Sequence, residues 1–142
     1  MGRESRLLPA LVLALALLGC VRADTPPAIA RGTECVSCGM RVGDPRWACE
    51  RHSDGRWLVY DSIECLLADK SATGPAWLTD WDHRALHAAD SLWIVRGDLP
   101  GPMGGGYAAF LDRASAEDVA AARHGRVMRF ADAVLAAQGE PR

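Results

Sequence analysis

The chain has 142 residues, a formal net charge of −2 and 49% hydrophobic residues, which suits a single domain with a core of its own. Lys70 is its only lysine, and no basic stretch runs along the sequence. This composition therefore gives no reason to expect a nucleic-acid partner.

The N-terminus has the pattern of an export signal. Arg3 and Arg6 precede an apolar run over residues 7–19 that is too short to span a bilayer, and Cys20 follows in a Leu-Leu-Gly-Cys sequence. This resembles a bacterial lipobox and predicts a signal peptide over residues 1–19, with lipidation of Cys20. An ordinary signal peptide with an incidental cysteine is the alternative.

Lipidation at this position predicts a protein anchored at the periplasmic face of a bacterial membrane. No Asp directly follows Cys20, which leaves an outer-membrane destination open. Residues 20–32 contain a Pro-Pro pair and predict a flexible tether, and residues 33–142 predict a single folded domain.

Seven short strands are predicted from β-branched and aromatic runs between turn residues. They are residues 40–42, 47–49, 56–60, 77–81, 91–95, 107–110 and 126–130. Residues 83–87 are polar and predict a helical or irregular turn. Residues 97–106 are rich in Gly and Pro and predict a loop.

Three helices are predicted from capping patterns. Asp61 is expected to cap the first, with Glu64 as its capping-box partner, and Ser115 the second, with Asp118 in that role. The third covers residues 132–138. Each half of the chain has a methionine in a glycine-containing loop and ends with a strand followed by a helix. This repeat predicts an α+β fold of two related halves, each with short antiparallel strands plus a helix.

Four cysteines remain after Cys20, namely Cys35, Cys38, Cys49 and Cys65. Disulfides persist outside the cytoplasm, so two structural bridges are one interpretation. Cys49 lies in a strand-like run and Cys65 in a helix-like run, which favours a structural or simply buried pair.

Cys35 and Cys38 differ, because Met40 follows them in one short loop. Thiolate and thioether sulfurs are soft ligands that select Cu(I) over hard ions. Met103 is the best further donor, since it lies in a Pro-Met-Gly-Gly-Gly loop that leaves a side chain accessible. The predicted metal ligands are therefore Cys38, Met40, Met103 and Cys35. Met128, between apolar strand neighbours, is expected to pack in the core.

The sequence leaves two alternatives to a copper site open, a thiol-disulfide oxidoreductase and a zinc-stabilised module. A Cys35–Cys38 disulfide would compete with metal binding, and the pair also suits a thiol-disulfide oxidoreductase, although a tether rather than a strand precedes it. A zinc-stabilised module would need further ligands such as histidines. The four histidines are expected at the surface, and they are His52, His83, His87 and His124. His87 or His124 could serve as an accessory copper donor.

Several of these motifs together resemble the NosL family of lipoprotein copper chaperones of nitrous-oxide reductase maturation. They are the lipobox, the Cys-x-x-Cys-Gly-Met motif at residues 35–40, the Trp93 strand, the loop and strand at residues 102–110, and residues 124–130. The resemblance implies an α+β fold of two related halves and one Cu(I) per monomer, held by Cys38, Met40 and Met103, in a binding protein without turnover. It also implies metal transfer to an assembly ABC-transporter complex and, through it, to the reductase. Cys49 and Cys65 are not part of the family pattern, and they could form a local disulfide or bind metal.

Overall fold

The computed structural model describes residues 25–139. The elements in chain order are β1 (Cys49–Ser53), β2 (Arg56–Tyr60), α2 (Ile63–Ala68), β3 (Ala76–Thr79), β4 (Leu86–Ala88), the 3-10 helix η1 (Ala89–Ser91), β5 (Trp93–Arg96), β6 (Tyr107–Phe110), α3 (Arg113–Ala122), β7 (Arg126–Arg129) and α4 (Phe130–Gly139). The predicted signal peptide and Cys20 lie outside the described residues. Within that range no helix is long and apolar enough to cross a membrane.

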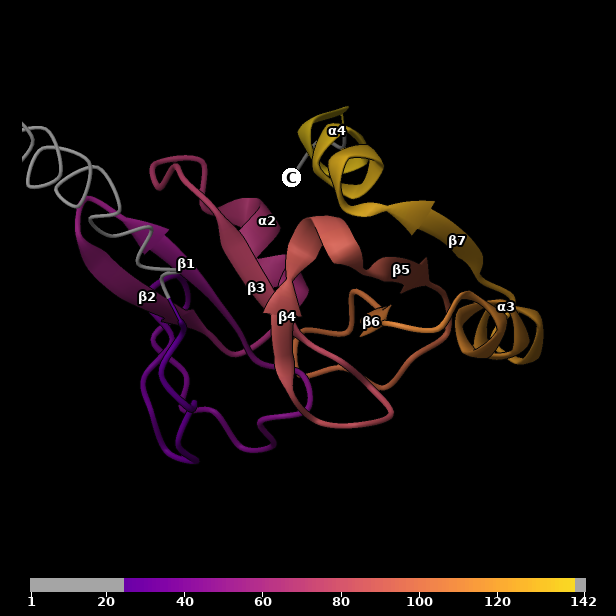
Figure 1. Cartoon of the computed structure of the whole chain (residues 1–142), viewed down its shortest axis with the longest axis horizontal. Helices are drawn as coiled ribbons and strands as arrows, with labels where there is room; N and C mark the ends of the chain where they lie inside the picture. Colours follow the sequence, from indigo (N-terminus) through magenta and orange to yellow (C-terminus); the bar gives the residue numbers. More distant parts are fainter. Residues whose placement is uncertain (1–24, 140–142) are drawn as a thin grey trace, which may run out of the picture.

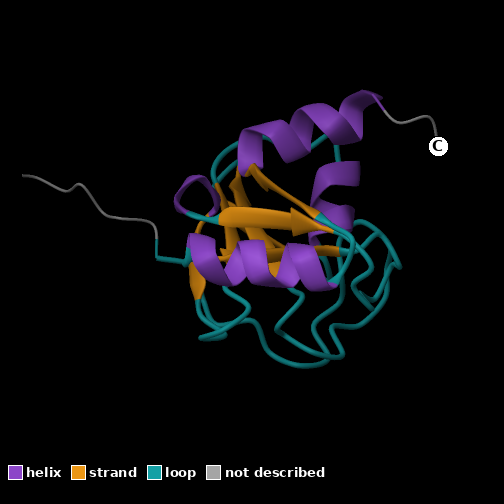
Figure 2. Ribbon diagram, turned by 90° about the vertical axis from the view of Figure 1, so that its right-hand side faces the viewer, coloured by secondary structure: helices purple, strands orange, loops and turns teal. Residues whose placement is uncertain are grey.

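The strands form two antiparallel sheets, with strand orders β2-β1-β3-β4 and β6-β5-β7 (Figure 1). Helix α2 packs against β1 and β2, helix α3 packs against all three strands of the second sheet, and α4 contacts β5, β7 and α2. The predicted α+β class is confirmed, since each half of the chain contains an antiparallel sheet packed with helices. Figure 2 shows connecting loops gathered at the end of the molecule opposite α4.

Two clusters of buried apolar side chains form the core. The larger includes Leu66 of α2, Leu78 of β3 and Ile94 of β5, and the smaller lies between α3 and the second sheet around Phe110. Cys35 also belongs to the larger cluster. The loop that precedes the first sheet is therefore fixed to the core at that cysteine.

Asp80, directly after β3, joins the two sheets. Its backbone forms a parallel bridge with Ala109 of β6. Its fully buried carboxylate accepts hydrogen bonds from the N–H of Leu111 (2.8 Å) and from the N–H and ring Nδ1 of His83 (2.8 and 2.6 Å). Burial of Asp80 raises the pKa of this carboxyl, but these hydrogen bonds outweigh it and hold the pKa below its ordinary value.

Asp80→Asn is expected to lower the free energy of unfolding at pH 7 by about 1.5–3 kcal/mol, because hydrogen bonds to a buried charge are lost. Since folding lowers this pKa, the stabilisation is complete above the unfolded value near about 3.9 and is lost as the pH falls through the folded value. Urea unfolding at pH 7 and at pH 3 should show a gap between variant and parent that shrinks in acid. A gap of equal size at both pH values would contradict this role.

The strand predictions were right for residues 56–60 and 107–110, right except for the strand ends at three further places, and wrong for residues 40–42 and most of 47–49. Residues 40–42 make only a single bridge between Glu34 and Arg41. The strand predicted at 47–49 begins at Cys49, because Trp47 and Ala48 form backbone turns back to Asp44 and Pro45. Residues 83–87 are not helical, since their C-terminal part enters β4. The other strands are displaced by one or two residues at their ends.

Both capping predictions were wrong, the first by one residue and the second by three. Ser62, not Asp61, caps α2, and its hydroxyl accepts from the N–H of Cys65 at 3.3 Å. Asp112, not Ser115, caps α3 by accepting from the N–H groups of Ala114 and Ser115. Asp and Ser are almost equally good caps, so the residue type does not decide between them, and the cap is the candidate at the point where the chain leaves the preceding strand. The third helix begins earlier than predicted, at Phe130.

Candidate metal centre

The loop of residues 35–40 is a tight turn fixed by its own backbone. Gly39 N–H donates to the carbonyl of Cys35 (2.9 Å), and Cys35 N–H donates to the carbonyl of Met40 (2.8 Å). Gly39 adopts a φ of 75°, a conformation that glycine reaches at little cost. The N–H of Val36 binds the carbonyl of Val59 in β2. The turn therefore buries Cys35 and leaves Cys38 exposed beside the strand.

The chain leaving β2 supplies the other half of the site. Because Ser62 caps α2, the side chain of Asp61 is not used for capping, and it is 3% exposed. Cys65 lies in the first turn of α2 and is also 3% exposed. Packing of α2 against β1 and β2 brings both side chains towards the 35–40 loop.

These two segments place three thiols and one carboxylate together. The Sγ atoms of Cys35, Cys38 and Cys65 and a carboxylate oxygen of Asp61 all lie within 4.8 Å of one another. Oδ1 of Asp61 is buried and has no hydrogen-bond partner in the structure. Among residues 25–139 this is the cluster of His, Cys, Asp or Glu side chains that meets the geometry of a metal site, and no histidine belongs to it.

The electrostatics of the cluster favour a bound cation over free thiolates. Burial raises the pKa of Cys65 well above its ordinary value, and the neighbouring Asp61 raises it further. The pKa of Cys38 is also raised, first by partial burial of its sulfur and also by the Cys35 thiol, although the Met40 backbone opposes this. Without a cation these thiols are therefore held protonated, and a soft metal ion would replace the protons.

The two predicted methionine ligands are unusually accessible for apolar side chains. Met40 is 43% exposed and Met103 is 46% exposed. Met103 lies in the loop that follows β5, and Gly105 of this loop packs so closely on Glu64 that an added Cβ would lie 2.3 Å from its Cγ. Glu64 directly precedes Cys65, so the Met103 loop rests on the helix turn that carries the cysteine. Met128 packs against the core as predicted.

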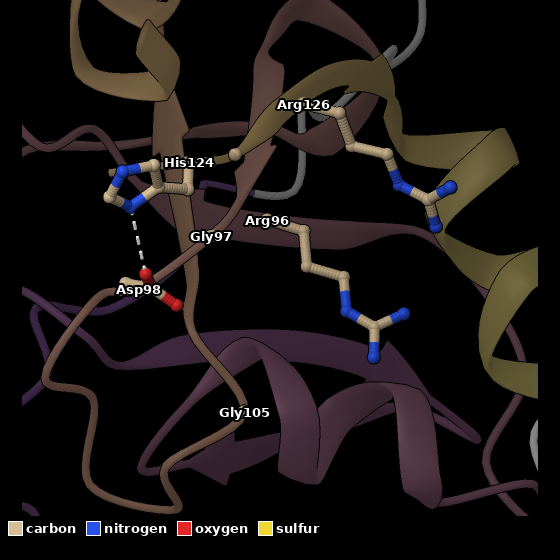
Figure 3. A pocket seen from close by; sticks show the side chains of 7 residues that line it. Arg96, Gly97, Asp98, Gly105, His124 and Arg126 are labelled. Carbon is tan, nitrogen blue, oxygen red and sulfur yellow. Dashed lines mark hydrogen bonds and ion pairs between the residues drawn. The ribbon is translucent and has the colours of Figure 1, made fainter. Parts of the chain in front are cut away.

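A pocket of about 390 Å³ opens at the base of the same loop (Figure 3). Gly105 lines it together with Gly97, and His124 faces Asp98 across it with Nδ1 3.1 Å from Oδ2. Figure 3 shows the Arg96 and Arg126 side chains extending away from this His–Asp pair. His124 is thus engaged with a carboxylate rather than placed in the thiol cluster.

The predicted site residues are thus only partly assembled in one place. Cys35 and Cys38 lie together as predicted, with Met40 in the same turn, while Met103 lies on a separate loop that contacts α2 through Glu64. Asp61 was not predicted as a ligand, and Cys65 was left open between a structural role and metal binding. Their nearest sequence signal is the strand-to-helix junction that placed Asp61 at the start of a helix.

Cys49 behaves as a structural thiol. It is fully buried, its Sγ donates to the carbonyl of Ser62 at 3.3 Å, and its pKa is raised well above the ordinary value, first by burial. Cys35, Cys38, Cys49 and Cys65 are all free thiols in the structure. The interpretation with two structural disulfides therefore does not describe this state of the chain.

A tight sulfur cluster between a surface turn and a helix, in a two-sheet α+β fold, is the arrangement of a protein that binds soft metals. The chain belongs to the NosL family, whose model matches residues 26–136. Its fold is similar to the crystal structure of the copper chaperone NosL from Shewanella denitrificans, with a TM-score of 0.60 and 20% sequence identity over 74% of this chain and 95% of that one. A comparison with curated proteins finds no match.

Proposed function

We propose that this protein is a Cu(I) metallochaperone that is lipid-anchored at the periplasmic face of a bacterial membrane and supplies copper for the centres of nitrous-oxide reductase. The observation that carries the proposal is the meeting of three thiols within 4.8 Å, with Cys38 exposed at the surface. Membership of the NosL family and the likeness to a copper chaperone support the same metal.

Each sulfur has a distinct role in this proposal. Cys38 is the ligand through which copper would enter and leave, because a donor of the partner can reach a Cu(I) ion held at an exposed thiolate, bind it and displace that thiolate. Cys35, which is 1% exposed, would bind the same ion from the side of the core. Met40 and Met103 complete the Cu(I) site with thioethers, which bind without losing a proton and do not form disulfides. Their exposure leaves both sulfurs free to reach the ion.

The site favours metal transfer over thiol-disulfide catalysis. An oxidoreductase Cys-x-x-Cys pair lies at a helix N-terminus, where the helix lowers the pKa of the first thiol. Here the pair lies in a turn before β1, no helix begins there, and the pKa of Cys38 is raised. We therefore propose a binding protein without turnover.

The proposed partners follow from the cargo and the anchor. A lipid on Cys20 and a tether over residues 20–32 would hold the copper site within reach of a membrane complex. We propose that this complex is the ABC-transporter assembly that matures the reductase, and that copper passes through it to the enzyme.

Cu(I) titration of the reduced chain against a competing chelator tests the metal and the ligands together. One Cu(I) per chain is expected, and Met40→Leu and Met103→Leu should each weaken binding by roughly 10–100-fold while leaving the fold intact. Met128→Leu, a core methionine, is the matched control and should bind as the parent does. Parental affinity in both thioether variants would remove the methionines from the site.

A second experiment tests the client. Cells that lack this protein should yield nitrous-oxide reductase with less copper. A gene for the parent protein should restore the copper content of the reductase, and a gene for the Cys38→Ser variant should not. Full copper loading of the reductase without the protein would contradict the proposed client, although not the copper site.

A further inference from the structure

A groove between α2 and α4 has apolar walls and takes no part in the proposed copper site. The two helices contact each other, and the groove follows their junction (Figure 1). Leu66 and Leu67 of α2 and Val134 of α4 line it, together with the loop of residues 69–74. Its volume is about 530 Å³, which is the size of a site for a small organic ligand.

Two cationic side chains line the same groove. Arg51 of β1 donates from one terminal nitrogen to the carbonyl of Gly74 at 3.0 Å. Its Nε is buried and has no hydrogen-bond partner among residues 25–139. Lys70, the only lysine of the chain, is exposed and makes no ion pair within that range. A buried donor without an acceptor costs free energy, and an anion in the groove would supply the acceptor.

The acidic side chain that lines the groove is already used by its own loop. Oδ1 of Asp69 accepts from the N–H and the hydroxyl of Ser71 (3.0 and 2.6 Å) and from the N–H of Ala72, and Oδ2 accepts from the Tyr60 hydroxyl at 2.8 Å. The Ser71 hydroxyl, with the other donors, holds the pKa of Asp69 below its ordinary value, although partial burial opposes this. Two cations therefore face one engaged carboxylate, which leaves an excess of positive charge.

We propose that this groove binds an anionic lipid, with its phosphate headgroup on Arg51 and Lys70 and its first methylene groups on the apolar walls of α2 and α4. Guanidinium and ammonium groups both bind phosphate oxygens. A free phosphate would leave the apolar walls uncovered, and an uncharged chain would leave the cations unpaired. An anionic amphiphile satisfies both, and the proposal does not rest on the copper function.

The surface of α4 beside the groove suits the same partner. Leu135, the residue after Val134, is 65% exposed, and Asp132 is the only charged residue of this helix. Apolar side chains on an exposed helix can enter the boundary between headgroups and acyl chains. Because the connecting loops gather at the end opposite α4 (Figure 2), a lipid bound here would turn those loops away from the bilayer.

Octyl phosphate, titrated into the full chain and followed by amide nitrogen–proton NMR, provides the first test. Signals of groove residues such as Lys70, Thr73 and Val134 should shift along one saturable curve. Inorganic phosphate and n-octanol supply the headgroup and the chain separately, and each should bind at least about 10-fold more weakly. Absence of shifts in the groove, or equal affinity for either partial ligand, would overturn the proposal.

Variants then identify the headgroup contacts. Lys70→Gln changes an exposed side chain and should weaken octyl phosphate binding by about 5-fold. Arg51→Gln should weaken it further, since this guanidinium is partly buried. Arg56→Gln, an exposed arginine of β2 outside the groove, is the matched control and should bind as the parent does. Because Arg51→Gln also loses the bond to Gly74, Lys70→Gln decides the outcome, and parental affinity in it would exclude this headgroup site.

Vesicles test whether the groove acts at a membrane. Binding of the full chain to phosphatidylcholine vesicles should strengthen when phosphatidylglycerol is included, and this gain should be smaller in Lys70→Gln than in Arg56→Gln. Since all variants share the same N-terminal apolar run, its contribution cancels in the comparison. Equal gains in the two variants would overturn the proposal as a general charge effect. Cu(I) affinity should stay at the parental value in Lys70→Gln, so either proposal can fail without the other.

Discussion

Cys38→Ser is expected to lower Cu(I) affinity by about 1,000-fold or more, the largest effect of any single change in the site. Cys38 is the exposed thiol of the cluster and lies in the same turn as Met40. A serine hydroxyl is a hard donor that does not ionise near neutral pH, so it replaces a charged soft ligand with a poor one. A 1,000-fold change corresponds to about 4 kcal/mol of binding free energy.

The matched control is Cys49→Ser. Cys49 is a buried thiol of the same fold but lies outside the cluster, and its Sγ donates to the carbonyl of Ser62. Serine can make the same hydrogen bond, so Cu(I) affinity should stay within a few fold of the parent. Competition against a Cu(I) chelator measures both variants. Equal losses in the two would show that the effect is a general one on folding, and parental affinity in Cys38→Ser would remove Cys38 from the site.

Gly106→Ala is expected to destabilise the fold by about 3 kcal/mol or more and to weaken Cu(I) binding as well. Gly106 has a φ of 72°, and a Cβ at this position would lie 2.0 Å from the carbonyl oxygen of Gly97. The Gly106 carbonyl also accepts the N–H of Gly97 at 2.9 Å, which closes the base of the Met103 loop. A side chain would force these strands apart and displace the loop that carries Met103.

Gly104→Ala separates backbone strain from this clash. Gly104 has a nearly identical φ of 69°, but an added Cβ would meet nothing within 4 Å. This variant should lose only the roughly 1 kcal/mol that a non-glycine residue costs in the left-handed region. Urea unfolding gives the two stabilities and chelator competition gives the two copper affinities. Similar losses of stability in both variants would rule out the steric clash.

The position of Glu64 explains why the loop and the cluster are expected to respond together. The N–H of Tyr107, at the end of the Met103 loop, lies 3.4 Å from Oε1 of Glu64, and Gly101 and Gly105 both pack on this carboxylate side chain. The next residue along α2 is Cys65. A change in the loop therefore reaches the first turn of the helix through one side chain.

The local pattern of the sequence was enough to predict the features that depend on neighbouring residues. The aromatic and β-branched runs at residues 56–60 and 107–110, bounded by turn residues, gave the right strands, and the sulfur-rich turn at residues 35–40 predicted a soft-metal site. These features follow from strand propensity, glycine conformation and ligand chemistry, which operate over a few residues. The same local signals place Met103 in an open loop, where the structure also exposes it.

The choice of caps and the full donor set depended on the tertiary structure. Neighbouring Asp61 and Ser62 are both good caps, and where β2 ends against β1 decides that Ser62 caps α2 and Asp61 turns into the cluster. Cys65 has no motif that links it to Cys35 and Cys38. It joins them because α2 packs on the first sheet, and a contact between distant segments leaves no periodic trace in the sequence.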